Sequence, residues 1–310
     1  MENKFKYSFN EKRYHTYNYY LKTKYNCKVA KVILDAGFTC PNRDGKKGYG
    51  GCIYCSNKGS GDSNIALQED IINQYIKNKE VMDNKWPNAL YIPYFQSFSN
   101  TYGPLDKIKS MIEPFLNMDE VCEIALATRC DCLEDDVIAY LNSINKPVTL
   151  ELGLQSSSDI TGKIINRGHS FSEFKEALYK LEKTNIKVCV HVLNGLPFES
   201  KEDMLQTIKD INHLPFDGIK IHMLHILKNT VLEKMHNENH YELITRDEYI
   251  ELVVKQLELL KPEVVVERLT GDPIKDDLIE PNWVLNKTTI LNDIDKLMRK
   301  LDTYQGSKYE

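Results

Sequence analysis

The sequence predicts an α/β fold, a partial (β/α)6 open TIM-like barrel with an N-terminal helical extension and a C-terminal irregular extension. Short apolar segments rich in β-branched residues alternate with amphipathic segments, which is typical of parallel βα units. Polar side chains recur just after these apolar segments, where the carboxyl ends of parallel strands meet at one edge. Six such units are fewer than the eight of a closed barrel, so we expect the barrel to be open.

The 310 residues are expected to form three regions: a basic, tyrosine-rich extension over 1–27, the barrel over 28–267 and a tail over 268–310. Strands are predicted at 28–36, 89–95, 121–128, 148–154, 186–193 and 219–224, with a last short strand at 263–267. Helical spacing of apolar residues predicts helices at 65–79, 105–116, 134–144, 171–183, 201–211, 246–260 and 290–301. Ser170 is the expected N-cap of the helix over 171–183.

Three cysteines, Cys40, Cys52 and Cys55, lie in a glycine-rich loop directly after the first predicted strand. Three thiolates on one loop can hold three irons of a 4Fe-4S cluster, which leaves the fourth iron open for chemistry. A structural zinc site is an alternative, although it needs two more ligands and no second C-x2-C pair follows. Thiols without any metal are the remaining interpretation.

The composition restricts the class of protein. No apolar run is long enough to span a bilayer, and the first residues lack the apolar centre of a signal peptide. The eight cysteines are therefore interpreted as free thiols of a cytoplasmic protein and not as a disulfide framework. We expect no association with a membrane, and the sequence indicates no oligomeric state.

The net charge of −5 is unevenly distributed, because residues 1–60 contain twelve Lys or Arg and only four Asp or Glu. Around Lys12, Arg13, Lys22 and Lys24 the basic residues are interleaved with tyrosines. This pattern suits phosphate contact combined with base stacking on RNA. The alternative is an amphipathic helix whose tyrosines pack on the barrel and whose lysines are solvated.

Further motifs resemble those of radical S-adenosylmethionine (radical SAM) enzymes. The C-x11-C-x2-C spacing with Tyr54 before the last cysteine resembles the branch of the elongator catalytic subunit, which modifies the tRNA wobble uridine. The segments 128–131 (Thr-Arg-Cys-Asp), 151–155 (Glu-Leu-Gly-Leu-Gln) and 166–169 (Asn-Arg-Gly-His) also resemble that branch. The segments 35–45, 94–97, 100–102 and 268–272 resemble the small bacterial YtqA/YhcC-type members. The similarity extends over nearly the whole chain.

The resemblance implies that Cys40, Cys52 and Cys55 bind a 4Fe-4S cluster whose open iron binds S-adenosylmethionine. Reductive cleavage of that cofactor to a 5′-deoxyadenosyl radical is the implied chemistry. The implied contacts to S-adenosylmethionine are Gln96, Ser97, Arg129, Glu151, Gln155, Arg167, Asn194 and Gly195. Gln96 and Ser97 would contact the methionine amine, Gln155 and Arg167 the carboxylate and ribose, and residues 194–197 the adenine.

Ordinary structural roles compete with these assignments. Gln96 and Ser97 could simply complete a strand-end turn, and Arg167 could form a surface ion pair. Glu151 could accept from ribose hydroxyls or be a buried partner of Arg129. No catalytic residue is assigned.

Histidines and two further cysteines are weaker candidates. His191, His222 and His225 lie near strand ends, where they could act in acid/base chemistry or be ordinary polar groups. Cys130 and Cys132 could bind a second metal or be partly buried thiols.

The resemblance favours tRNA as the substrate, at the C5 substituent of the wobble uridine, with an electron donor such as flavodoxin or ferredoxin. Two alternatives stay open. One is the same chemistry on a small molecule or porphyrin, and the other is a non-enzymatic metal-binding scaffold.

Overall fold

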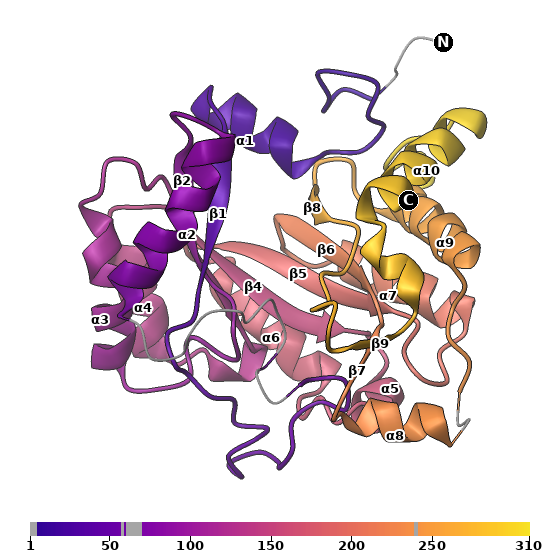
Figure 1. The fold of residues 1–310 in the computed structure, drawn as a ribbon, viewed down its shortest axis with the longest axis horizontal. Coiled ribbons are helices and arrows are strands. Elements are labelled where there is room, and N and C mark those ends of the chain that lie inside the picture. The colour runs from indigo at the N-terminus through magenta and orange to yellow at the C-terminus, as the bar shows by residue number, and fades with distance from the viewer. Residues whose placement is uncertain (1–4, 57–58, 60–69, 239–240) are drawn as a thin grey trace.

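The computed structural model describes residues 5–56, 59, 70–238 and 241–310. A single sheet of seven parallel strands curls into an open half-barrel, and its strands follow one another in the order of the sequence except that β8 replaces β7 at the end (Figure 1). The strands are β1 (Val29–Leu34), β2 (Leu90–Phe95), β3 (Ile124–Thr128), β4 (Val148–Gln155), β5 (Lys187–Asn194), β6 (Gly218–Met223) and β8 (Val265–Arg268). A separate antiparallel pair joins β7 (Ile226–Leu227) to β9 (Leu278–Glu280).

Helices connect successive strands and cover the outer face of the sheet (Figure 1). They are α1 (Tyr17–Tyr25), α2 (Ile71–Lys85), α3 (Leu105–Leu116), α4 (Asp135–Ser143), α5 (Asp159–Ile164), α6 (Phe171–Leu181), α7 (Lys201–Asn212), α8 (Val231–Asn237), α9 (Arg246–Leu259) and α10 (Lys287–Lys300). Two short 3-10 helices are η1 (Cys130–Cys132) and η2 (Asn282–Leu285). In the described part of the chain, no helix combines the length and apolarity needed to cross a membrane.

Local sequence explains where several helices begin. Ser170 caps α6 and forms a reciprocal capping box with Glu173, which confirms the predicted cap. Equivalent boxes start α7 at Ser200 and α9 at Thr245. These caps satisfy backbone N–H groups that the first helical turn leaves without partners.

The two faces of the sheet differ in character. Apolar side chains from the strands pack against the helices and form the main hydrophobic core. The inner face is mixed: β1, β2 and β3 carry a small apolar cluster there, whereas along β4 the alternate residues Glu151, Gly153 and Gln155 face the inside of the half-barrel. The site therefore lies inside the barrel, on the face opposite the core.

The predicted elements agree with the structure in order and type. The predicted short strand at 263–267 forms β8, a full member of the sheet, so the sheet has seven strands and not the six of the predicted βα units. The predicted helix at 65–79 corresponds to α2, but its first residues, 65–69, lie outside the described residues. The prediction omitted α5, α8 and the β7–β9 pair, because elements this short carry too few periodic residues to be detected.

The two ends of the chain pack against each other beside the edge strand β8 of the half-barrel. The segment before α1 runs beside β8, where the N–H of Val266 donates to the carbonyl of His15 (N···O 2.7 Å), and α1 contacts both β8 and β1 (Figure 1). Gln305 binds the same segment, donating to the carbonyl of Arg13 (2.8 Å) and accepting from the N–H of His15 (2.8 Å). The tail is therefore less irregular than predicted, since α10 packs on α9 and the last residues hold the N-terminal segment.

Three basic residues of the N-terminal extension have acidic partners. Lys12 pairs with Asp295 (2.5 Å), Arg13 with Asp302 (2.9 Å) and Lys24 with Glu123 (2.5 Å). Tyr14 is buried, and Tyr17 lines the interior of the barrel. The packing interpretation is thus confirmed for these tyrosines, whereas the three cations are paired and not merely solvated.

Candidate active site at the cysteine loop

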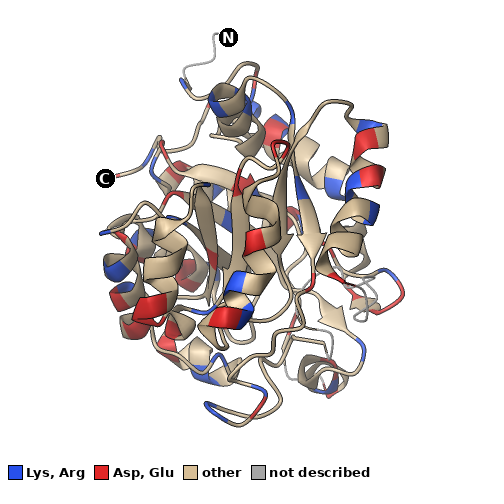
Figure 2. Ribbon diagram, turned by 90° about the vertical axis from the view of Figure 1, so that its left-hand side faces the viewer, with Lys and Arg blue, Asp and Glu red and all other residues tan. Residues whose placement is uncertain are grey.

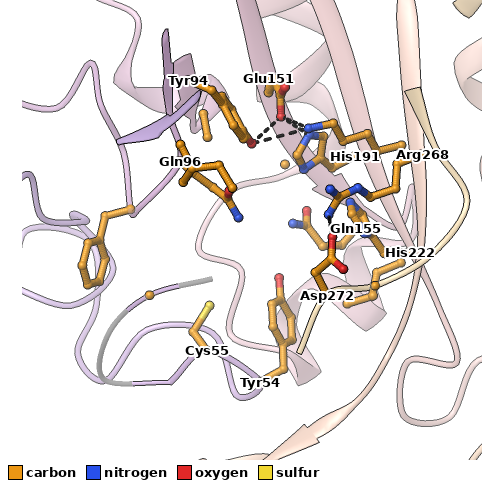
Figure 3. A pocket seen from close by; sticks show the side chains of 18 of the residues that line it. Tyr54, Cys55, Tyr94, Gln96, Glu151, Gln155, His191, His222, Arg268 and Asp272 are labelled. Atoms are coloured by element: carbon orange, nitrogen blue, oxygen red, sulfur yellow. Dashed lines mark hydrogen bonds and ion pairs between the residues drawn. The ribbon is translucent and has the colours of Figure 1, made fainter. Parts of the chain in front are cut away.

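A cavity of 570 Å³ lies between the cysteine loop and the inner face of the sheet (Figure 3). The structure brings many of the residues predicted for the site to its walls: Cys40, Cys52, Cys55, Gln96, Arg129, Glu151, Gln155 and Arg167. Because parallel strands end at the same edge, residues distant in sequence converge there. Ser97, Asn194 and Gly195 do not line this cavity.

The cysteine loop is held against the segment 165–168. The N–H of Ile53 donates to the carbonyl of Ile165 (3.1 Å), and the Asn166 amide donates to the carbonyl of Gly51 (2.7 Å). In return, the Asn42 amide donates to the carbonyl of Asn166. Gly168 has φ +78°, and a Cβ there would lie 2.8 Å from the Asn42 side chain, so this close approach requires glycine. The segment 166–169 therefore positions the loop.

The loop thiols Cys52 and Cys55 differ in how readily they become thiolates. Each is partly exposed, at the wall of the cavity. A hydrogen bond with Cys55 and the positive charge of Arg129 lower the pKa of Cys52 to about 6, against the opposing effect of burial. The same hydrogen bond, together with burial, raises the pKa of Cys55 well above its usual value. Metal ligation requires the thiolate form, so the electrostatics of the loop favour ligation first at Cys52.

The arrangement fits a cluster better than a single ion. Within the described ranges, no three His, Cys, Asp or Glu side chains are placed to hold one metal ion. A closed tetrahedral zinc site would require such convergence, whereas thiolates that bind separate corners of a four-iron cluster do not need to meet at one point. The donor set of three thiolates on one glycine-rich loop fits the 4Fe-4S group.

Arg129 and Arg167 are both buried and bound to the protein itself. Arg129 forms a bidentate pair with Asp131 (2.8 and 2.9 Å) and donates to the carbonyl of Arg167 (2.6 Å). Arg167 donates to the carbonyls of Leu154 (2.9 Å), Ser156 (2.5 Å) and His169 (2.9 Å) and pairs with Asp159 (3.0 Å). Their first role is to fix the ends of β3 and β4 below the cysteine loop.

The side chains of Gln96 and Gln155, unlike those of the two arginines, are not bound to other parts of the described protein. Among the described residues, the side-chain amide of Gln96 has no partner, and the buried Oε1 of Gln155 accepts no hydrogen bond. Gln155 also has φ +66°, in the left-handed region, at an irregularity in β4. Buried polar atoms without partners and strained backbone both occur preferentially at binding sites. These two amides, labelled in Figure 3, therefore fit a polar cofactor.

The residues outside the cavity have internal partners. Asn194 exchanges two hydrogen bonds with Gln256 (2.8 Å each). Gly195 has φ +84°, and a Cβ there would lie 3.0 Å from Ile244. The carbonyl of Ser97 accepts from the side chain of Asn100 (3.0 Å). These contacts favour the strand-end turn for Ser97, and they bind the Asn194 side chain to Gln256 and not to the cavity.

Glu151 is the centre of a charged cluster at the floor of the barrel. It is 1% exposed and accepts from Lys31 (2.6 Å), Tyr94 (2.6 Å), His191 (2.8 Å) and Lys220. The prediction that Arg129 could be its partner is wrong, because Arg129 binds Asp131. Lys220 and Lys31 hold the pKa of Glu151 well below its usual range despite its burial.

Lys31 extends this cluster across the open side of the half-barrel. It lies on the edge strand β1 and also pairs with Glu267 of the other edge strand, β8 (2.6 Å). Burial alone would lower the pKa of Lys31, but the charges of Glu151 and Glu267 raise it well above the usual value. The floor is thus a charge network whose members satisfy one another.

The three candidate histidines all line the cavity. Burial lowers the pKa of His191 and His222, which keeps both rings neutral, and lowers that of His225 to about 4. Their rings differ in partners, since His191 binds Glu151 and His222 binds the carbonyl of Thr270 (3.1 Å). The sequence alone could not separate these roles.

Cys130 and Cys132 belong to η1, below the cysteine loop. Their exposures are 5% and 3%, and burial raises the pKa of each thiol to about 12. Neither lines the cavity. Buried, protonated thiols are inert, so the structure supports the interpretation as buried thiols and not as a second metal site.

The sequence did contain a signal for the floor that the prediction did not use. Lys31, Glu151 and Lys220 are each the only Asp, Glu, Lys or Arg of their strand, and His191 interrupts the apolar stretch of β5. Parallel strands buried on both faces are normally continuous apolar runs. Isolated charges in such strands therefore mark positions that face a polar interior.

Comparisons with known proteins agree with this geometry. The profile of the Radical SAM superfamily matches residues 40–211, and that of the Radical_SAM C-terminal domain matches residues 216–300. YtqA of Bacillus subtilis, an uncharacterized protein, is 44% identical over 310 residues, which cover 99% of this chain and 96% of YtqA. The chain therefore belongs to the Radical SAM superfamily, and its cofactors are a 4Fe-4S cluster and S-adenosylmethionine, as predicted.

Two further similarities are more distant. The tRNA uridine(34) acetyltransferase of Dehalococcoides mccartyi is 30% identical over 127 residues, covering 40% of this chain and 28% of that protein. The structure of archaeal Methanocaldococcus infernus Elp3 with an N-terminal deletion superposes with a TM-score of 0.68 at 16% identity. This superposition covers 90% of this chain and 64% of that chain, and it shows a shared fold.

Proposed function

We propose that this radical SAM enzyme modifies the C5 substituent of the wobble uridine in tRNA. The observation that carries the proposal is the cysteine loop at the carboxyl edge of the half-barrel, open to a cavity lined by Gln96 and Gln155, where the buried Oε1 of Gln155 accepts no hydrogen bond from the described residues. When bound, the reduced cluster supplies the electron that cleaves S-adenosylmethionine and produces a radical that abstracts hydrogen. The protein supplies binding, orientation and exclusion of water.

Different parts of the site would serve these tasks. Cys40, Cys52 and Cys55 would hold the cluster, and the segment 165–168 would hold the loop in place. The amides of Gln96 and Gln155 would bind polar groups of S-adenosylmethionine. Arg129 would stabilise the thiolates by its charge and contact the cofactor only secondarily, because its guanidinium is already bound to Asp131.

Similarity to tRNA-modifying proteins supports the choice of substrate. The Dehalococcoides mccartyi protein, part of which aligns with this chain, is named for uridine 34 of tRNA, which supports a uridine of the anticodon as the target. An anticodon base is unpaired, so a protein can turn it out and enclose it. We further propose that the enzyme works in the cytoplasm with a small electron-transfer protein such as flavodoxin or ferredoxin.

The test compares tRNA nucleosides from a strain lacking the gene with those from the complemented strain by mass spectrometry. The expected result is loss of one modified uridine, restored by the wild-type gene but not by a Cys52→Ala variant. An unchanged nucleoside profile in the deletion strain would refute tRNA as the substrate. Cleavage of S-adenosylmethionine by reduced, reconstituted protein tests the radical chemistry separately.

A further inference from the structure

The cavity is more positive than the rest of the chain. The chain carries a net charge of −5, yet among the residues that the structure describes seven basic ones line the cavity against four acidic ones. The basic residues are Lys28, Lys31, Arg43, Arg129, Arg167, Lys220 and Arg268, and the acidic ones are Glu151, Glu267, Asp272 and Asp277. On the outer face drawn in Figure 2, by contrast, basic and acidic residues are interspersed over the helices. A positive interior in an acidic protein favours an anionic ligand.

Arg268 is the cation best placed to bind such a ligand. Lys31, Lys220 and Arg129 are each held by buried carboxylates. Arg268 ends β8, and its side chain keeps 36% of its surface exposed. Within the described part of the chain, its one ion-pair partner is Asp272, bound through a single guanidinium nitrogen (2.5 Å). The remaining N–H donors are left for a ligand.

Asp272 neutralises Arg268 only in part, because the same carboxylate also pairs with Lys287. The position of Asp272 is fixed by its neighbour Gly271, whose N–H donates to Sδ of Met223 (2.8 Å). A Cβ at residue 271 would lie 3.2 Å from that sulfur, which leaves little room for a side chain. The loop thus holds one carboxylate against two cations, a local excess of positive charge.

Two neutral imidazoles stand beside Arg268 (Figure 3). Nδ1 of His222 lies 3.1 Å from the carbonyl of Thr270, and a carbonyl can only accept, so Nδ1 carries the proton and Nε2 is an acceptor. By the same reasoning, Nε2 of His191 donates to Glu151, and its Nδ1 is an acceptor. The wall beside the guanidinium therefore offers acceptors for N–H or O–H groups of the ligand.

We propose that Arg268 binds an oxyanion of the substrate, which, resting on the proposed function, is a phosphate of the target nucleotide. His191 and His222 would accept hydrogen bonds from the neighbouring base or ribose. Arg268 lies across the cavity from Cys55 in Figure 3, whereas the amino acid part of S-adenosylmethionine must reach the cluster at the cysteine loop. Arg268 thus serves the second ligand, and a carboxylate substrate would present it with the same chemistry.

The test uses anaerobically reconstituted holoenzyme and isothermal titration calorimetry with four ligands. Uridine 5′-monophosphate carries the phosphate, uridine lacks it, tricarballylate is a carboxylate without a nucleoside, and S-adenosylmethionine is the cofactor. The wild type should bind the nucleotide about tenfold or more tightly than uridine, since hydrogen bonds to charged groups are the strong ones. Arg268→Met should remove that difference, Arg268→Lys should keep part of it, and Asp272→Asn should enlarge it. Affinity for S-adenosylmethionine should be unchanged in all three variants.

Arg299→Gln, which replaces an exposed arginine far from the cavity, is the matched control, and thermal unfolding verifies that each variant is folded. Binding of tricarballylate but not of the nucleotide, with dependence on Arg268, would retain the anion site and refute the nucleotide substrate. Three results would overturn the proposal: a nucleotide preference unaffected in both Arg268 variants, loss of S-adenosylmethionine affinity in place of nucleotide affinity, or no binding of either anion to the wild type.

Discussion

Two parts of the cavity differ in how their polar side chains are bonded. They are the floor, around Glu151, and the mouth, which comprises the cysteine loop with Gln96 and Gln155. At the floor, Glu151 accepts from four side chains and holds two lysines. At the mouth, the buried Oε1 of Gln155 accepts no hydrogen bond from the described residues. A buried polar group without a partner is destabilising, so the protein has reason to keep one only where a ligand completes it. The comparison separates structural from ligand-binding residues within one cavity.

The largest expected effect is at the mouth. Replacing Cys40, Cys52 or Cys55 by alanine should abolish cluster incorporation and cleavage of S-adenosylmethionine, because each thiolate is expected to ligate one iron. Iron content and visible absorbance of reconstituted protein measure this directly. Cys27→Ala, at a half-buried cysteine that does not line the cavity, should keep its iron. Full iron content in all three loop variants would contradict the assignment.

The next effect is at the floor. Glu151→Gln should lower the free energy of unfolding by about 3 to 5 kcal/mol, because it leaves buried cations without their carboxylate. Urea unfolding measures the change, and the exposed Glu176→Gln is the control. A variant with unchanged stability but lost affinity for S-adenosylmethionine would place Glu151 with the ligand-binding residues after all.

Acidification should destabilise the cavity wall. Burial lowers the pKa of His225 to about 4, and burial together with Arg167 and Arg129 does the same for His169, from 6.5 in each case. As the pH falls from 6.5 to about 4, these histidines are protonated in the unfolded chain before they are protonated in the folded one. Each should therefore lower the free energy of unfolding by about 1 to 3 kcal/mol across that pH range. Unfolding free energy measured over this range should fall less steeply in His225→Gln, whereas replacing the exposed His213 should not change the slope.

The smallest expected effect is at Gln155, in the mouth. Gln155→Asn retains an amide and tolerates the positive φ, but it withdraws the amide from the cavity. Affinity for S-adenosylmethionine should fall about tenfold, as expected for one lost hydrogen bond to a charged or strongly polar group. The free energy of unfolding should be nearly unchanged. A large loss of stability with intact affinity would assign Gln155 to the structural class and would weaken the contrast between mouth and floor.

The sequence predicted the order of the strands and the cysteine loop well, because apolar periodicity and cysteine spacing are local properties. The resemblance implies that Gln155 and Arg167 both contact S-adenosylmethionine; both line the cavity, but their surroundings differ. Arg167 is bound to backbone carbonyls, whereas Gln155 keeps a free oxygen. Which polar groups find protein partners depends on neighbours distant in sequence, and no local pattern contains that information.

The sequence by itself determined that three thiols lie on one loop after the first strand. It also determined that seven apolar segments form the parallel strands. Only the tertiary structure decided which charges meet. Glu151 binds Lys31 and Lys220, which lie 120 and 69 residues away along the chain. Those contacts exist because the sheet curls until its inward-facing residues approach one another, and curvature of this kind arises from the packing of all strands together and not from any one of them.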